Sequence, residues 1–270
     1  MPRSCTVTER ETGALYLWRH SALYVGYDVA PEMHRHSAAQ CAVALDGPLV
    51  VRTENGFEVE TEGAVFVDAN IPHCVSSPEG KIAFLYLERT LFPPSAAKAV
   101  PTRASPPGLI VRDMPFDAEL RAKLMQVRTG SLSRAEASDT RTKLLSLFIP
   151  PAPQPAIDPR VQKVMQFIAA HPMQHPDTQQ LADMAGLSPS RLQHLFSDHT
   201  GMPIRRYLLW QRIRCVLEAV HGGANLTEAA HEAGFADSAH FSRTFRDMTG
   251  ITPSDVFGRK PRTTITICDD

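Results

Sequence analysis

Hydrophobic residues recur with two different periods in the two parts of the chain. In the first part, short apolar or alternating runs such as "ALYLW", "CAVAL", "AVFVD" and "IAFLYLE" are separated by "DG", "ENG", "TEG" and "PEG". Short apolar runs with glycine-containing turns between them are typical of antiparallel β-structure. After the segment "IPPAPQP" the period becomes helical, with Asp158 placed as a cap and Pro159 in the first turn. Four apolar residues then share one helix face: Val161, Val164, Met165 and Ile168.

The proline-rich segment divides the chain. It holds four of the 22 prolines and continues neither a helix nor the interior of a sheet, so we expect a linker between domains. The predicted fold class is α+β and multidomain, with an N-terminal antiparallel β-barrel, then helices, then an all-α C-terminal domain. The predicted boundaries are 1–112 for the barrel, 113–149 for the helices, 150–156 for the linker and 157–260 for the C-terminal domain.

Two apolar stripes of helical period lie between the predicted barrel and the linker. One interpretation is that they pack on the β-domain of the same chain. The other is a dimer interface, because an apolar stripe near a linker is a common partner surface. Both interpretations stay open on the sequence, and the second predicts a homodimer. The stripes consist of Phe116, Leu120, Leu124 and Val127, and of Leu144, Leu145, Leu147 and Phe148.

One pattern occurs twice in the C-terminal part, as "LADMAGLSPSRLQHLF" at 181–196 and as "AAHEAGFADSAHFSRTF" at 229–245. Each copy has small residues on a short helix, a glycine at the turn, a capping Ser188 or Asp237, and a second helix with apolar residues at i and i+4. This arrangement predicts two helix-turn-helix units, whose second helices are shaped to enter a major groove of DNA.

The stretch between the two copies predicts one long helix. Pro203 is placed to open it and Gly222 to close it. Its 18 residues from 203 to 220 correspond to about 27 Å at about 1.5 Å per residue. Successive major grooves on one face of DNA are about 34 Å apart. We therefore expect this helix to hold the two units against consecutive grooves of one duplex.

The region from about 160 to 257 resembles the AraC/XylS family of transcription regulators. The resemblance rests on "LTEAAHEAGFADSAHFSRTFRDMTGITP", which contains the elements A-x-x-x-G-F, S-x-x-F-x-R-x-F and G-x-x-P in order. Val256 and Phe257 stand where the family usually has an aromatic and then a basic residue, and His240 stands where a tyrosine is common. The resemblance implies a one-component regulator that binds promoter DNA, with RNA polymerase as a further partner if it activates.

Helix phase selects the residues that would face DNA. In each second helix the apolar residues must face the core, which leaves the polar residues outward. Gln193 suits a bidentate bond to adenine, and arginines suit guanine edges or phosphates. By resemblance, Ser190, Gln193 and His194 occupy base-reading positions. The full predicted set is Ser190, Arg191, Gln193 and His194 in the first helix, and Ser238, Ala239, His240, Ser242 and Arg243 in the second, with Arg246 directed at a phosphate.

Charge alone does not indicate a nucleic-acid partner. The net charge is −1, and the segment from Ala156 to Arg262 holds 12 basic against 10 acidic residues. A DNA-binding role therefore depends on where the basic residues lie. Each arginine taken singly can also be a solvated surface charge. Seven of them nevertheless fall in or between the two units: Arg191, Arg205, Arg206, Arg212, Arg214, Arg243 and Arg246.

The cysteines and the N-terminus indicate where the protein works. Five cysteines are scattered with no C-x-x-C pair, so free thiols are expected rather than disulfides or a cysteine zinc site. The N-terminus lacks the apolar stretch of a signal peptide, and no apolar run is long enough to span a membrane. We expect a soluble, cytoplasmic, nucleoid-associated protein with no membrane partner.

Three histidines in the predicted barrel form a candidate site. His34 and His36 share a strand face, and His73 follows a proline turn. The spacing of His34, His36 and Gln40 resembles the first motif of the cupin barrel, except that Gln40 replaces a glutamate. Three imidazoles suit a divalent metal such as Zn, Fe, Ni or Mn, with Gln40 as a weaker fourth ligand than a carboxylate. The alternative is that the four residues line a pocket for an organic effector or are hydrogen-bonded barrel residues.

These features favour a regulator over an enzyme. In the favoured hypothesis the barrel binds a small-molecule effector, the central helices dimerise and the C-terminal units bind promoter DNA, with no cofactor required and no catalytic residue. The alternative is a metalloenzyme of the dioxygenase or isomerase type fused to a DNA-binding domain. No acid/base pair accompanies the histidines, which counts against that alternative. A third hypothesis, a plain interaction module, leaves the two polar helix faces unexplained.

Overall fold

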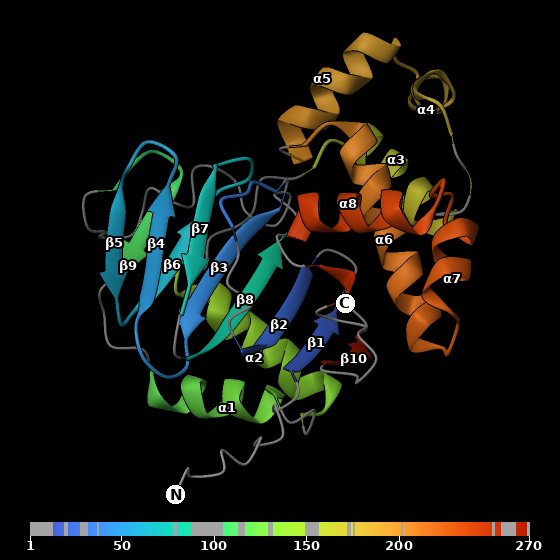
Figure 1. The fold of residues 1–270 in the computed structure, drawn as a ribbon. Coiled ribbons are helices and arrows are strands. Elements are labelled where there is room, and N and C mark those ends of the chain that lie inside the picture. The colour runs from blue at the N-terminus through green and yellow to red at the C-terminus, as the bar shows by residue number, and fades with distance from the viewer. Residues whose placement is uncertain are drawn as a thin grey trace, which may run out of the picture.

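The computed structural model has a β-rich N-terminal domain and a helical C-terminal domain that pack side by side (Figure 1). It describes residues 13–18, 21–27, 32–36, 38–77, 80–87, 105–112, 117–128, 132–148, 157–171, 174, 176–200, 202–249, 252–254 and 263–268. The predicted linker at 150–156 lies outside these residues. No described helix combines the length and the apolar character needed to cross a membrane. Four cysteines are described and all are free thiols, as expected: Cys41, Cys74, Cys215 and Cys268.

The described strands form two β-sheets. The larger has seven strands in the order β10-β1-β2-β8-β3-β6-β9, and the smaller has three in the order β5-β4-β7. The predicted fold class is confirmed, but the barrel is not closed, because no pairing among the described strands joins the edges of the two sheets. The strands are β1 (Gly13–Leu17), β2 (Ser21–Tyr27), β3 (Ala39–Ala44), β4 (Leu49–Thr53), β5 (Glu58–Thr61), β6 (Ala64–Val67), β7 (His73–Ser76), β8 (Lys81–Leu87), β9 (Leu109–Arg112) and β10 (Thr263–Ile267).

Strand β10 comes from the C-terminal end of the chain and pairs in parallel with β1, Gly13 opposite Thr263 and Leu17 opposite Ile267. The other paired strands are antiparallel. The alternating sequence "TTITI" has the period of a strand, but its partner is some 250 residues away. The chain therefore returns to its first strand after completing the helical domain.

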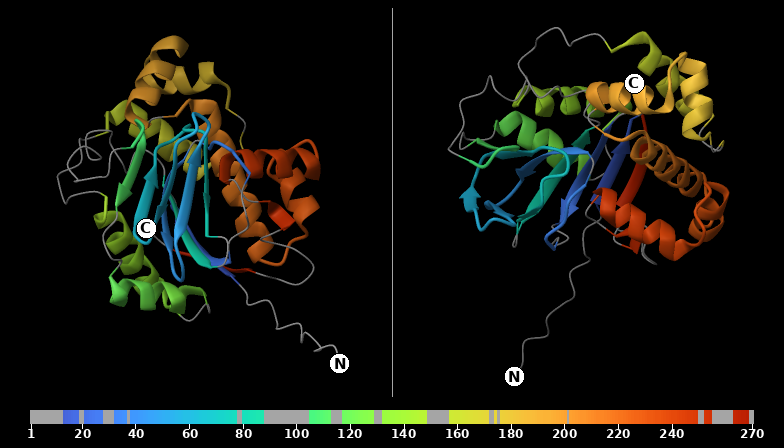
Figure 2. Two further views of the ribbon diagram at one scale, coloured as in Figure 1. Left: turned by 60° about the vertical axis from the view of Figure 1, so that its left-hand side comes forward. Right: turned by 90° about the horizontal axis from the view of Figure 1, so that it is seen from above.

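Helices α1 (Ala118–Arg128) and α2 (Arg134–Ser146) cover one face of the seven-stranded sheet (Figure 2). Ser133 and Glu136 form a capping box at the start of α2. The dimer interpretation of the apolar stripes does not hold for their described core residues, because these pack into the core of the same chain beneath the sheet. Phe116 and the side chain of Val127 lie outside the described residues. The buried members are Leu120, Leu124, Leu144 and Phe148, with Leu145 and Leu147 partly buried against the same cluster.

Six helices of the C-terminal domain lie within the described residues. Asp158 caps the first of them, and Pro203 and Gly222 bound the long helix α6, as predicted. The predicted length of 18 residues is confirmed, and the helix lies at 204–221 instead of 203–220. The helices are α3 (Pro159–Ala170), α4 (Thr178–Ala185), α5 (Pro189–Thr200), α6 (Ile204–His221), α7 (Leu226–Glu232) and α8 (Ser238–Thr249).

The second helix-turn-helix unit packs directly on the β-domain. One hydrophobic cluster contains Phe84 and Tyr86 of β8 together with Trp210 of α6 and Phe245 and Met248 of α8. The first unit has a separate core with α3 and the start of α6. In Figure 1, α8 accordingly lies against the sheets, whereas α5 projects away from them.

Candidate DNA-reading helices and histidine site

The first helix-turn-helix unit has its turn at Gly186, which is in the left-handed conformation with φ of 66°. A residue without a Cβ adopts this conformation at least cost, and it ends α4 so that α5 can cross it. Leu192 and Phe196 of α5 are buried in the core. The predicted polar face of α5 is exposed in full: Ser190, Arg191, Gln193 and His194.

The second unit repeats this arrangement around Gly234, whose φ is 80°. Phe241 and Phe245 of α8 are buried, and Asp237 caps the helix by accepting a hydrogen bond from the backbone N–H of His240 at 2.5 Å. The predicted reading residues on α8 differ in exposure. Ser238, Ala239 and Arg243 are exposed, whereas His240 and Ser242 are half-buried.

The side chain of His240 is fixed by contacts with the turn that precedes α8. Its ring lies edge-on to Phe235 with 5.4 Å between centroids, and its Nδ1 accepts a hydrogen bond from the backbone N–H of Ala236 at 3.3 Å. These contacts fix the ring at the start of α8. His240 therefore positions the reading helix as well as standing on its polar face.

The seven arginines that the sequence places beside DNA are not equivalent. Arg206 pairs with Asp247 at 2.9 Å, and Arg214 pairs with Glu218 at 2.8 Å. Arg246, expected on a phosphate, instead pairs with Glu32 of the β-domain. Arg212 is half-buried, and burial lowers the pKa of its guanidinium. In this conformation three of the seven are exposed and have no ion pair among the described residues: Arg191, Arg205 and Arg243.

A shallow hollow lies beside each reading helix where it meets α6. Gln193, His194 and Arg205 line the one beside α5. His240 and Arg243 line the one beside α8. Each reading face therefore has a basic side chain next to it, which is the arrangement that phosphate contacts beside a groove require.

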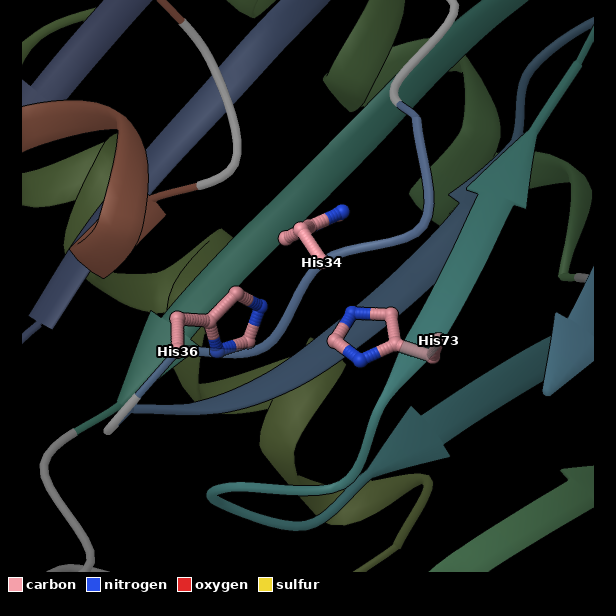
Figure 3. A group of neighbouring side chains, drawn as sticks. All are labelled: His34, His36 and His73. Carbon is pink, nitrogen blue, oxygen red and sulfur yellow. The ribbon is translucent and has the colours of Figure 1, made fainter. Parts of the chain in front are cut away.

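The three histidines of the β-domain come together as the sequence predicts (Figure 3). Ring centroids lie 4.6 Å apart for His34 and His73, 4.8 Å for His36 and His73, and 5.4 Å for His34 and His36. His34 and His73 are also joined through their backbones, whose N–H groups each donate to the carbonyl of the other residue. One ring nitrogen of each histidine lies within 4.8 Å of the others.

The hydrogen bonds of these rings set their tautomers. In each ring Nδ1 lies on a backbone carbonyl: that of Glu32 for His34 at 2.8 Å, Ala38 for His36 at 2.9 Å, and Ile71 for His73 at 2.7 Å. A carbonyl only accepts, so each Nδ1 carries the proton and each Nε2 carries a lone pair. Histidines that bind a metal are held in this way by backbone carbonyls.

None of the three Nε2 atoms has a hydrogen-bond donor beside it among the described residues. The Nε2 of His34 is buried and has no hydrogen-bond partner among the described residues. Gln40 Oε1 lies 3.2 Å from Nε2 of His36 and 2.9 Å from Nε2 of His73. An amide oxygen and two nitrogen lone pairs repel one another at these distances unless a cation lies between them or the amide turns its NH2 group toward the rings.

The three imidazole rings are neutral near pH 7, so a protonated histidine does not supply the cation between the amide oxygen and the Nε2 atoms. Burial is the main cause that lowers the pKa of His36 to about 4 and that of His73 to about 2. Burial also lowers the pKa of His34, and the nearby charge of Arg246 lowers it further. Neutral imidazoles with free Nε2 lone pairs are the form that binds a metal. The donor set of three imidazoles and one amide oxygen therefore fits a divalent metal such as zinc.

Sequence reasoning missed two residues at the rim of this site. Tyr86 lies edge-on to His36, with 5.5 Å between ring centroids, and its hydroxyl donates to the carbonyl of Thr249 at 2.7 Å. Glu32 pairs with Arg246. Tyr86 stands opposite Gln40 in the pairing of β3 with β8, which no local sequence pattern specifies.

Comparison with known proteins finds similarity to bacterial transcription regulators. A family model described as a helix-turn-helix domain matches residues 181–259. The arabinose operon regulatory protein of Salmonella typhimurium is 33% identical over 105 residues, which is 37% of each chain. The XylDLEGF operon transcriptional activator 1 of Pseudomonas putida is 29% identical over 107 residues, 38% of this chain and 32% of that one. These matches thus span about a third of the length of either relative.

Two further similarities extend over most of the chain. The regulator NimR of Escherichia coli is 24% identical over 248 residues, 88% of this chain and 86% of that one. A crystal structure of ToxT from Vibrio cholerae has a TM-score of 0.53 at 13% identity, over 87% of this chain and 96% of that one, and shares the fold. Two helix-turn-helix units of the predicted form, joined by one long helix, agree with this set of relatives. Residues 181–259 are a helix-turn-helix domain similar to that of AraC/XylS regulators.

Proposed function

We propose that the protein is a sequence-specific DNA-binding transcription regulator whose β-domain binds a small-molecule effector. The observation that supports this most directly is the pair of helices α5 and α8, each with exposed polar residues, joined through the single 18-residue helix α6. A helix of this length spans most of one turn of the duplex. The two reading helices then lie in successive major grooves, and selection from a random duplex pool by the whole chain yields sites with two recognised segments about one turn apart.

The first reading helix carries the larger share of base recognition. Gln193 offers the paired donor and acceptor that match an adenine edge, and Arg191 offers the fork that matches guanine. Nδ1 of His194 lies 2.7 Å from the carbonyl of Ser190, one turn earlier, so its Nε2 remains an acceptor for a cytosine or adenine amino group. On α8, Ser238 and Arg243 are the exposed residues with comparable chemistry.

Replacing Gln193 and His194 by alanine is expected to lower the preference for the selected site over unrelated DNA. Loss of a bidentate base contact costs about 1–3 kcal/mol, or roughly 5- to 150-fold. Competition titrations with selected and scrambled duplexes measure this preference. The matched control is Gln166→Ala, an exposed glutamine on α3, which leaves the preference unchanged. An unchanged preference in the double variant removes both residues from the reading face.

In the β-domain, His34, His36 and His73 would hold a divalent metal, with Gln40 as a neutral fourth donor. The support is the set of Nδ1–carbonyl hydrogen bonds, the buried Nε2 of His34 without a partner among the described atoms, and the amide oxygen between two Nε2 atoms. A bound metal supplies a Lewis-acidic position for an oxygen or nitrogen donor of the effector. DNA binding itself requires no cofactor in this proposal.

Gln40→Glu is expected to raise the affinity for Zn²⁺ by about tenfold or more, because a carboxylate adds a full negative charge to an otherwise neutral donor set. Competition with a zinc indicator measures the affinity. His34→Ala, which removes the least buried of the three ligands, is expected to weaken Zn²⁺ binding instead. If the unaltered chain and Gln40→Glu both fail to bind Zn²⁺, the site is a hydrogen-bonded or organic-ligand pocket.

The remaining partners are proposed on family grounds alone. A homodimer and a contact with RNA polymerase are proposed from the resemblance to AraC/XylS regulators, as is a place of action at the nucleoid. The metalloenzyme alternative predicts turnover of a small molecule by the metal-loaded chain, whereas the sensor binds its effector without consuming it. A binding assay followed by recovery of the intact effector separates the two.

A further inference from the structure

The C-terminal end of α8 rests on the rim of the histidine site. Tyr86 donates a hydrogen bond from its buried hydroxyl to the carbonyl of Thr249, the last residue of the helix. One turn earlier, Arg246 pairs with Glu32 at 2.5 Å. Burial raises the pKa of Tyr86, so its hydroxyl stays protonated and remains a donor. Both contacts join the second DNA-reading helix to the β-domain.

Each of these two contacts is made by a residue that also touches the histidines. The backbone carbonyl of Glu32 accepts the hydrogen bond from Nδ1 of His34. The ring of Tyr86 lies against the ring of His36. One residue therefore connects the histidine site to the end of α8 on each side: Glu32 next to His34, and Tyr86 next to His36. A shift of His34 or His36 can change the position of α8 through these direct contacts.

Arg246 has two mutually exclusive partners. Helix phase directs its guanidinium to a DNA phosphate, whereas in this structure the guanidinium pairs with the carboxylate of Glu32. A carboxylate and a phosphate are recognised by the same guanidinium fork, so Arg246 meets only one of them at a time. The Glu32 side chain is 81% exposed, which keeps this pair weak enough to exchange.

Positive charge at the histidine site and positive charge on Arg246 disfavour each other. Arg246 is bound to the side chain of Glu32, whose backbone carbonyl accepts the hydrogen bond from Nδ1 of His34, so its positive charge lies near that ring and opposes a cation there. A divalent cation at the three rings carries twice the charge of a protonated histidine. It repels Arg246 and attracts the carboxylate of Glu32, and both effects weaken the same ion pair.

We infer that filling the histidine site with a divalent cation loosens the docked end of α8, frees Arg246 from Glu32 and raises the affinity of the second helix-turn-helix unit for DNA. This inference rests on the proposed function, because it needs both DNA binding and a metal at His34, His36 and His73. Arg246, Glu32 and Tyr86 act as positioning residues, since none of them belongs to the donor set or to a base contact.

Thermodynamic linkage between the Zn²⁺ and DNA sites gives the size of the expected effect. If Zn²⁺ raises DNA affinity by some factor, DNA must raise Zn²⁺ affinity by the same factor. Couplings between two sites usually fall between about 5- and 150-fold, and the exposure of the Glu32–Arg246 pair places this one near fivefold.

The experiment uses the whole chain in three titrations: Zn²⁺ alone, DNA alone, and each in the presence of the other. The unaltered chain is expected to show a coupling of about fivefold in both directions. Glu32→Gln is expected to raise metal-free DNA affinity by up to about fivefold and to lower the coupling toward one. Arg246→Gln is expected to bind DNA less tightly and to abolish the coupling. The matched controls are Glu58→Gln and Arg52→Gln, which break an exposed ion pair of similar geometry elsewhere on the β-domain and should leave the coupling intact.

The possible failures are distinguishable. If the chain binds no DNA, the proposed regulator function is wrong; if it binds DNA but no Zn²⁺, only the metal assignment and this inference are wrong. If both bind and neither affects the other, or if Arg246→Gln keeps the coupling, the inference alone is overturned. His34→Ala tests whether Zn²⁺ acts at a different site. If this variant keeps the coupling between Zn²⁺ and DNA, the inference is also overturned.

Discussion

The affinity of the chain for duplex DNA is expected to fall about 40-fold between roughly 50 and 200 mM salt if three arginines contact phosphates, and about 6000-fold if all seven do. The lower value follows from the exposed residues Arg191, Arg205 and Arg243, and the higher one requires the paired arginines to exchange their carboxylates for phosphates. Each neutralised phosphate contributes about −0.9 to the slope of log K against log salt concentration. Fluorescence anisotropy of a labelled selected duplex gives that slope.

Single substitutions assign the slope to residues. Arg205→Gln is expected to reduce its magnitude by about 0.9 and to weaken binding to selected and unrelated DNA alike. Arg52→Gln serves as the control, because Arg52 is also an exposed arginine and pairs with Glu58 on the β-domain. A slope near zero for the unaltered chain contradicts the assignment of any of these arginines to phosphates.

The main helices and turns of the helical domain could be predicted because their signals are local. Asp158, Pro203 and Gly222 bound helices through capping and backbone preferences that act within one turn. Gly186 and Gly234 mark the two turns because the left-handed conformation favours glycine. Helix period then fixes which side chains are buried, and the polar face of α5 follows without knowledge of the tertiary structure.

The arrangement of the β-domain was harder to predict, because strand pairing is not local. The alternating runs identify β3, β4 and β8, but their period does not show that the two sheets stay open instead of closing into a barrel. The pairing of β10 with β1 joins opposite ends of the chain. No local pattern could have specified that pairing.

The histidine site could be predicted in part from the sequence. The spacing of His34 and His36 and the resemblance to the cupin barrel predict that these two residues lie together with His73, and they do. Spacing does not predict the three carbonyl partners that fix every Nδ1 proton, since those depend on backbone positions in the folded state. It also gives no sign that Arg246 would be drawn to Glu32, because that contact forms only when the domains dock.

Leu124→Ala is expected to lower the free energy of unfolding by about 2–5 kcal/mol, the usual cost of a cavity left by a buried leucine. Leu124 is fully buried in the cluster that joins α1 to the seven-stranded sheet. Because this face packs within one chain, the loss should not depend on protein concentration, whereas loss at a dimer interface would vary with it. Chemical denaturation at two concentrations a hundredfold apart tests this, with Gln126→Ala on the exposed side of α1 as a control that changes stability by less than about 0.5 kcal/mol. A concentration-dependent loss would return α1 to the dimer interface, and with it the proposal that the central helices join two copies of the chain.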